Sequence, residues 1–119
     1  MKNMHTISFK HAWDGLTHAF STQPNFGIHL LLSSLAVAGG FFFKITNTEW
    51  LVILLTISIG LVIELINTAI ESTVDLITSK RHPIAKIAKD TSAAAMLIYA
   101  VGAIVVASVI FLPKIWPYF

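Results

Sequence analysis

The stretch WLVILLTISIGLVIELINTAIESTVD, residues 50–75, decides the fold of this chain. Its first half, residues 50–63, has no charged side chain. At about 1.5 Å per residue, that half extends about 21 Å through a hydrocarbon layer about 30 Å thick. The second half keeps a helical pattern but contains the polar residues Glu64, Asn67, Glu71 and Asp75. The stretch therefore predicts a membrane-spanning helix with a polar stripe at one end.

Two further segments predict spans on either side of this helix. Residues 26–43 are apolar and follow Pro24, which suits a helix start, and residues 90–112 are uncharged after Asp90, which we expect to cap a helix. The chain is 55% hydrophobic and 12% charged with a mean hydropathy of +0.77, far from the roughly 25% charged residues of soluble domains. We predict an all-α integral membrane protein, one domain over residues 1–119, with spans at about 26–43, 50–78 and 90–112.

Composition also limits the classes of partner and site. The net charge is +2, but the eight Lys and Arg residues form no dense patch, which argues against a nucleic-acid partner. The absence of cysteine excludes a thiolate nucleophile and a zinc–thiolate site.

A helix over about 8–21 is predicted ahead of the first span. Apolar residues recur there at helical period: Phe9, Ala12, Trp13, Leu16, Ala19 and Phe20. This pattern favours an amphipathic helix lying in the membrane interface. The alternative is an ordinary packing helix.

The basic residues predict the orientation, because cytoplasmic flanks of spans are enriched in Lys and Arg. One side of the predicted membrane has Lys2, Lys10, Lys80, Arg81, Lys86 and Lys89, and the other has Lys44 and Lys114. We therefore expect a multi-pass protein of a bacterial-type cytoplasmic membrane, with its N-terminus and its second loop in the cytoplasm.

The polar stripe is the candidate site. At about 100° per residue its four members fall within roughly 80° of one another, so all project from one helix face. Glu64 is the deepest, and a carboxylate inside a bilayer is costly unless it is paired, hydrated or protonated. It suits a general base acting on an interfacial hydroxyl, whereas acids nearer water suit Mg²⁺, which brings nucleotide phosphates. The alternative is that these groups only bond neighbouring helices or reach toward water.

Basic residues opposite the stripe complete this chemistry. Lys89, and the loop residues Lys80, Arg81 and His82, are placed to reach phosphate oxygens. Lys80 and Arg81 are equally compatible with anchoring the loop to anionic lipid. The chain contains no glycine-rich phosphate loop, which excludes the common soluble nucleotide-binding folds.

The segment ELINTAIESTVD, residues 64–75, resembles the signature of the prokaryotic diacylglycerol kinases, a family that includes undecaprenol kinases. His82-Pro83, Lys89-Asp90 and the run Ala93-Ala94-Ala95 extend the resemblance. It implies a homotrimer of three-span subunits and transfer of the ATP γ-phosphoryl to a lipid hydroxyl. It also implies residue roles: Glu64 as base, Glu71 as a magnesium ligand, and Asn67, Lys89 and Asp90 near the nucleotide, with His11 and residues 80–82 lining that site.

Three departures from the family pattern concern this site. Gln23 stands where many relatives have a second metal-binding glutamate, and Gly27 stands where a basic residue is usual. An amide oxygen at Gln23 still ligates Mg²⁺, but without the charge that holds the ion most firmly. Lys80-Arg81 replaces the acidic and aromatic pair common before His-Pro.

Three functions remain open on the sequence. The first is a lipid kinase acting on undecaprenol or diacylglycerol, with a slight preference for undecaprenol from the His-Pro-Ile-Ala-Lys run and the Phe-Leu-Pro-Lys tail. The second is a proton-coupled transporter that titrates Glu64, and the third is a catalytically silent member of the family. Dependence on ATP separates the first from the others.

Overall fold

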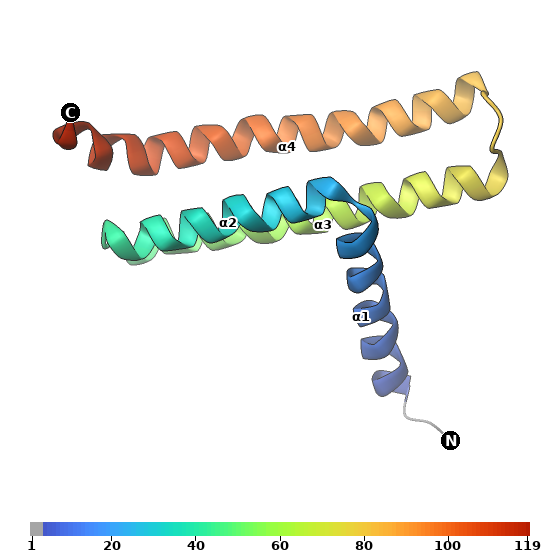
Figure 1. Ribbon diagram of the computed structural model, residues 1–119, viewed down its shortest axis with the longest axis horizontal. Coiled ribbons are helices and arrows are strands. Elements are labelled where there is room, and N and C mark those ends of the chain that lie inside the picture. The colour runs from blue at the N-terminus through green and yellow to red at the C-terminus, as the bar shows by residue number, and fades with distance from the viewer. Residues whose placement is uncertain (1–3) are drawn as a thin grey trace.

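The computed structural model describes residues 4–119, and those residues form four α-helices and a short 3₁₀ turn. In chain order the elements are α1 (Met4–Thr22), α2 (Pro24–Phe42), α3 (Asn47–Ile77), α4 (Pro83–Ile115) and η1 (Trp116–Tyr118). Helices α2, α3 and α4 run side by side, while α1 projects sideways from them (Figure 1). Lys2, counted above for the orientation, lies outside the described residues.

Three of the helices are long and apolar enough to cross a membrane, as predicted: α2, α3 and the segment Pro83–Tyr118. Few of their large apolar side chains are covered by the chain itself; Leu97 is 65% exposed and Ile98 74%. An apolar surface of this extent is unstable in water but matches a lipid environment. The helix predicted ahead of the first span is also present as α1, on which the large apolar side chains of Phe9, Trp13 and Phe20 are exposed.

The ends of α3 follow from local sequence. Thr46 and Glu49 form a capping box, in which the Glu49 N–H donates to Thr46 Oγ1 over 3.2 Å and the Thr46 N–H donates to Glu49 Oε1 over 3.0 Å. Lys44 takes a left-handed conformation, with φ of 52°, in the turn that precedes this cap. The turn returns the chain antiparallel to α2.

The start of α4 corrects the sequence analysis. The helix begins at Pro83, and its cap is His82, whose Nδ1 accepts from the Ile84 N–H over 3.1 Å. Asp90 lies seven residues inside the helix and forms an ion pair with Lys86, so it caps nothing. Proline suits the first helical position because it has no N–H to leave unbonded.

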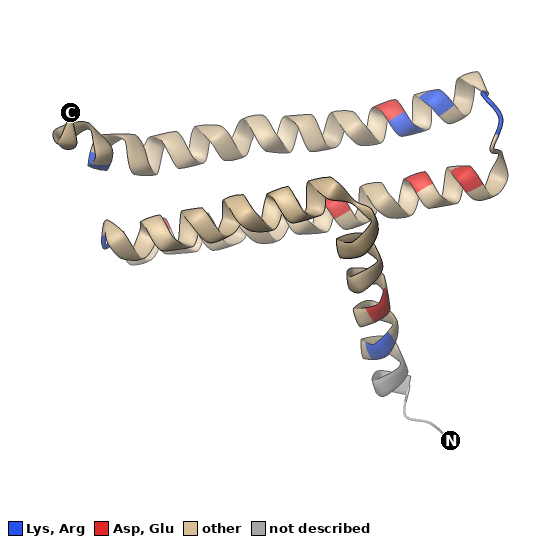
Figure 2. Cartoon of the chain, viewed as in Figure 1, with Lys and Arg blue, Asp and Glu red and all other residues tan. Residues whose placement is uncertain are grey.

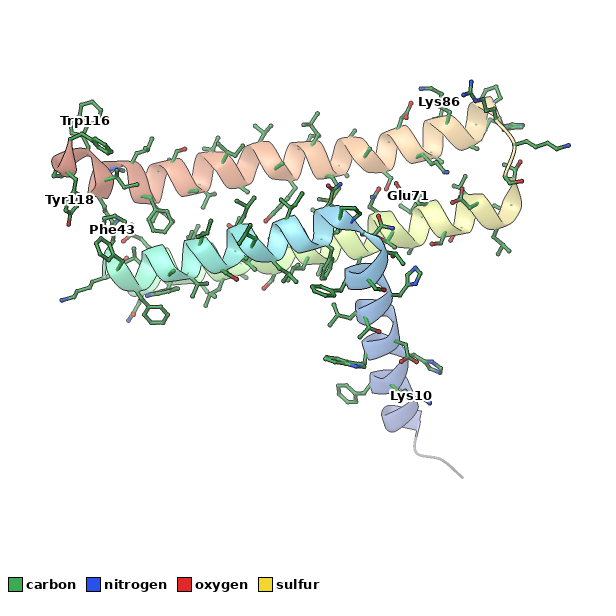
Figure 3. All side chains as sticks on the ribbon, in the orientation of Figure 1. Lys10, Phe43, Glu71, Lys86, Trp116 and Tyr118 are labelled. Carbon is green, nitrogen blue, oxygen red and sulfur yellow. The ribbon has the colours of Figure 1, made fainter. Side chains whose placement is uncertain are left out.

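Helix α3 is the central helix of the chain, since it packs against α1, α2 and α4. We call the end of α3 and α4 at which residues 78–82 connect them the loop end. At the opposite end Ile45, Ile53 and Ile110 form a small buried cluster. The Lys114 Nζ and Glu49 Oε2 atoms, 2.6 Å apart, join α4 to α3 at that same end. Figure 3 labels Phe43, Trp116 and Tyr118 there, far from Glu71 and Lys86.

Candidate active site

Glu64 is enclosed within the protein at the start of the polar stripe. Only 1% of the residue is exposed, and Oε2 has no hydrogen-bond partner within the described part of the chain. One turn further along α3, the buried Thr68 hydroxyl donates its hydrogen bond to the Glu64 backbone carbonyl over 3.0 Å, and not to the Glu64 carboxylate. A buried oxygen without a donor is costly and requires an explanation. A ligand hydroxyl that donates to this oxygen is one explanation.

Asn67 links α3 to α4. Its Oδ1 accepts a hydrogen bond of 2.6 Å from the Ser92 hydroxyl, and Ser92 is itself buried. The two residues line an open groove between the helices, together with Ile63, Ile66, Ile70, Ala88, Thr91 and Ala95. The bond fixes the rotation of α4 against the polar stripe.

The outer part of the stripe meets the basic residues of α4. Asp75 Oδ1 accepts from Lys89 Nζ over 2.6 Å, and the charge of Glu71 also acts on Lys89. Glu71 is half-buried, whereas Lys86 and Asp90 form an exposed ion pair within α4. In Figure 2 the charged residues of α3 and α4 gather toward the loop end, others lie on α1 and at the opposite end, and the middle of α2 and of α4 has none.

The loop residues play unequal parts in the structure. Lys80 and Arg81 are exposed, and the Lys80 N–H donates to Thr78 Oγ1 over 3.1 Å to shape the turn. His82 is committed to the cap of α4 through Nδ1. Its Nε2 is the ring nitrogen that this cap does not use.

His11 and Gln23 lie before α3 in the chain, on α1 and at the start of α2. His11 is exposed on α1, and Gln23 is the half-buried cap position of α2, where its side chain makes no capping bond. Within residues 8–119, no three His, Asp or Glu side chains gather closely enough to hold a metal ion. The chain by itself therefore brings Glu64, Asn67, Glu71, Asp75 and Lys89 along one line and leaves His11 and Gln23 on a separate element.

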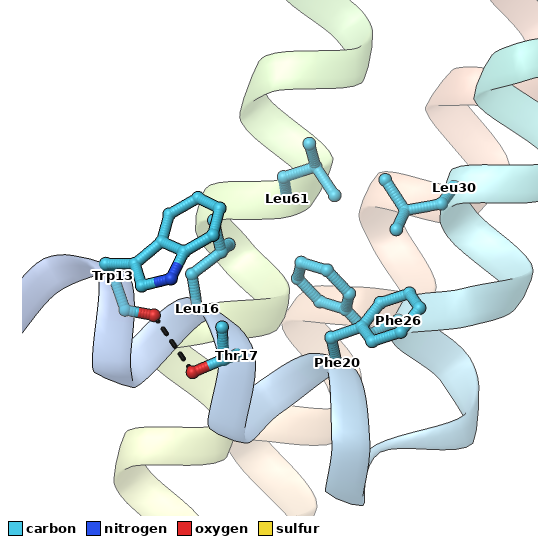
Figure 4. A pocket seen from close by; sticks show the side chains of 7 residues that line it. All are labelled: Trp13, Leu16, Thr17, Phe20, Phe26, Leu30 and Leu61. Atoms are coloured by element: carbon cyan, nitrogen blue, oxygen red, sulfur yellow. Dashed lines mark hydrogen bonds between the residues drawn. The ribbon is translucent and has the colours of Figure 1, made fainter.

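An apolar groove opens between α1, α2 and α3. Its walls come from α1, α2 and α3: Trp13, Leu16, Thr17, Phe20, Phe26, Leu30 and Leu61 (Figure 4). The one hydroxyl in this lining, that of Thr17, donates to the Trp13 carbonyl over 3.1 Å. Leu61 precedes Glu64 by three residues on α3, so the groove reaches the same helix face as the carboxylate.

Residues 10–111 match the family model for prokaryotic diacylglycerol kinase. The chain belongs to the prokaryotic diacylglycerol kinase family. It is 43% identical over 108 residues to an undecaprenol kinase of Bacillus subtilis. The aligned region covers 91% of this chain and 88% of that protein. A diacylglycerol kinase of Synechocystis is 37% identical over 92% of this chain, which spans 63% of that longer relative. A diacylglycerol kinase of Pseudomonas aeruginosa is 32% identical over 71% of this chain and 68% of the relative.

Membership of this family confirms the resemblance seen in residues 64–75 and the expectation of a lipid kinase, a phosphotransferase with an alcohol acceptor. It also agrees with the three apolar helices in describing a multi-pass bacterial membrane protein.

Several polar residues near the stripe were absent from the sequence analysis. Ser92 and Thr68 are small polar residues buried beside the stripe, and His29 and Tyr99 stack on each other with ring centroids 5.6 Å apart. Ionisable residues inside an apolar span are functional candidates by default. Applied to residues 26–43, this rule would have identified His29 from the sequence.

Proposed function

We propose that the chain transfers the γ-phosphoryl group of ATP to the hydroxyl of a membrane lipid alcohol, with undecaprenol as the preferred acceptor and diacylglycerol as the second. The observation that carries this proposal is the enclosed Glu64 carboxylate with its unpartnered Oε2. The choice of undecaprenol rests on the 43% identity to the Bacillus protein over nearly the whole of both chains.

Glu64 acts as the general base. Its carboxylate accepts the proton of the lipid hydroxyl while the lipid oxygen forms a bond to the γ-phosphorus and the bond to the leaving ADP oxygen breaks. The two oxygens lie in line about the phosphorus, and no phosphorylated protein intermediate is formed. Burial removes water that would compete as acceptor.

The nucleotide lies toward the loop end. Lys89 and Asp90, with Asn67, contact it, and Lys80, Arg81, His82 and His11 line the site. Lys80, Arg81 and His82 lie at the end of the stripe where Lys89 pairs with Asp75, while His11 lies on α1. They offset the charge of the phosphates.

The residues fit Mg²⁺ as the metal. This ion needs only one or two protein carboxylates because phosphates and water complete its shell, so the lack of a three-acid group among the described side chains is no obstacle. Glu71 would hold it, with Gln23 adding a neutral carbonyl oxygen. When bound, the ion neutralises charge on the phosphate oxygens.

The proposal places the loop end and the active site on the cytoplasmic side and three copies of the chain in each assembly. The open groove beside Asn67 and Ser92 and the separation of α1 from α4 support a site completed by a neighbouring copy. The apolar groove of Figure 4 accepts the hydrocarbon chain of the acceptor, because its lining is apolar and its Leu61 lies three residues before Glu64 on α3.

Transfer of radiolabelled phosphate tests the function directly. Purified protein in mixed micelles receives labelled ATP and Mg²⁺ with either undecaprenol or diacylglycerol. We expect labelled product with both lipids and a higher kcat/KM with undecaprenol. A lack of product with both, while a known relative is active in the same micelles, would refute the proposal in favour of a silent family member.

A further inference from the structure

A hydrogen bond between two neutral side chains joins α4 to α3 at the polar stripe. Ser92 Oγ donates to Asn67 Oδ1, and the two atoms are 2.6 Å apart. Only 8% of Ser92 is exposed, so little water competes for its hydroxyl. A buried hydroxyl that loses its partner is costly. The Ser92 hydroxyl is therefore a fixed donor to the Asn67 side chain.

This bond selects one of the two orientations of the Asn67 amide. An asparagine amide has an oxygen that accepts and a nitrogen that donates two hydrogens, and rotation about its last torsion exchanges the two ends. Because the oxygen faces Ser92, the nitrogen is turned away from it. Within residues 8–119 this is the one hydrogen bond of the Asn67 side chain, and Asn67 lines the open groove between α3 and α4. Both of its N–H groups are left for a ligand.

Asn67 lies between the proposed base and the proposed metal ligand. It follows Glu64 by three residues and precedes Glu71 by four, which places it about 4.5 Å beyond the first and about 6 Å before the second along α3. In-line transfer puts the γ-phosphorus between a lipid hydroxyl at Glu64 and a metal ion at Glu71. Asn67 is the stripe residue nearest to that position.

We propose that Ser92 is a positioning residue, which by donating to Asn67 Oδ1 directs the Asn67 amide N–H groups toward the γ-phosphoryl oxygens of ATP. Ionised phosphate oxygens only accept hydrogen bonds, so they bind the nitrogen end of the amide and repel its oxygen end. Ser92 acts through Asn67 and touches no substrate itself. The inference rests on the proposed function, because it takes ATP as the nucleotide and Asn67 as one of its contacts.

Removal of the Ser92 hydroxyl leaves the amide free to turn over. In Ser92→Ala the amide oxygen loses its donor, and both orientations become populated. The affinity for a γ-phosphoryl group then falls in proportion to the fraction of molecules that keep the nitrogen toward it. A hydrogen bond between neutral groups changes such an equilibrium by roughly twofold to tenfold. We expect a loss of affinity of that size.

Calorimetry in micelles with Mg²⁺ tests this with two nucleotides. The probes are ADP, which has no γ-phosphoryl group, and the β,γ-methylene analogue of ATP, which has one that is not transferred. We expect Ser92→Ala to bind the analogue about twofold to tenfold more weakly than the wild type does and to bind ADP equally well. Ser58→Ala is the matched control, because the exposed Ser58 hydroxyl donates to the Leu54 carbonyl of its own helix. An equal loss of affinity for both nucleotides overturns the inference, because the role of Ser92 would then be purely structural.

Two further variants separate positioning from packing. Ser92→Thr keeps the hydroxyl, so we expect it to bind the analogue as the wild type does. In an Asn67→Ala background, Ser92→Ala should weaken binding of the analogue no further, because its effect passes through the amide. An undiminished effect of Ser92→Ala in that background overturns the inference, and this comparison also decides the matter if Ser92→Thr does not fold.

The proposed function and the role of Ser92 fail in different ways. Wild-type protein that binds both nucleotides but phosphorylates no lipid refutes the lipid kinase, and the comparison of ADP with the analogue still decides the role of Ser92. Wild-type protein that binds neither nucleotide overturns both. Wild-type protein that phosphorylates lipid, with Ser92→Ala unchanged in its affinity for the analogue, overturns the inference alone.

Discussion

Glu64 combines burial with an unpartnered oxygen, and its neighbours on the stripe are progressively more exposed. We predict that Glu64→Gln lowers kcat by about 10²–10⁴-fold, the usual contribution of a general base. Nucleotide affinity should change little, since the nucleotide lies nearer the loop end. Single-turnover phosphate transfer and calorimetric nucleotide binding separate the two effects. Wild-type rates in the variant would remove Glu64 from the mechanism.

Gln23 tests the metal site. We predict that Gln23→Glu lowers the Mg²⁺ concentration needed for half-maximal activity, because a carboxylate holds the ion more firmly than an amide oxygen. Asn25→Asp is the matched control. Asn25 is exposed, and its replacement by Asp adds the same negative charge two residues away from position 23. If both variants titrate with Mg²⁺ as the wild type does, position 23 is not in the metal shell. If both variants lower the required Mg²⁺ concentration equally, the effect comes from the added negative charge in this region and not from a ligand at position 23.

The sequence predicted the part of the site that lies on one helix. Spacing alone aligns Glu64 with Asp75, because an α-helix fixes the direction of every side chain on it. The bond from Ser92 to Asn67 and the stack of Tyr99 on His29 join different helices. Such pairs depend on how the helices rotate and pack, which one sequence does not specify.

At the scale of elements, Gly60 sets how closely α2 and α4 approach α3. We predict that Gly60→Ala destabilises the protein by about 1–3 kcal/mol, the usual cost of overpacking, since its Cβ would overlap the rings of His29 and Tyr99. Gly102→Ala is the matched control, because a Cβ there meets nothing within 4 Å. Thermal unfolding in detergent micelles measures both. Equal stability of the two variants would contradict the close packing at Gly60.

The helix boundaries show where an apolar pattern stops being informative. The expected span of 26–43 agrees closely with α2, whose ends coincide with the ends of its apolar run. Helix α4 instead starts seven residues before the expected residue 90. Its first turns contain Lys86, Lys89 and Asp90, so an apolar pattern misses them, yet Pro83 and good helix formers such as Ala85 keep the backbone helical.

For the whole molecule, the two ends of the long helices differ in their number of basic residues. The loop end contains Lys80, Arg81, Lys86 and Lys89, whereas the opposite end has Lys44 and the paired Lys114. Between the ends the surface of the three long helices is apolar. The proposed kinase needs its nucleotide site in the compartment that supplies ATP, so function and the positive-inside rule require the same orientation.

Labelling of single cysteines tests that orientation, and the natural chain has no cysteine to interfere. Ser79 in the loop and Thr48 at the opposite end are both exposed, so Ser79→Cys and Thr48→Cys form a matched pair. We predict that a membrane-impermeant maleimide labels Thr48→Cys in intact cells and labels Ser79→Cys only after the membrane is opened. The reverse pattern would put Lys89 and Glu71 outside the cell. It would leave the proposed nucleotide site without ATP, so the orientation and the proposed mechanism would fail together.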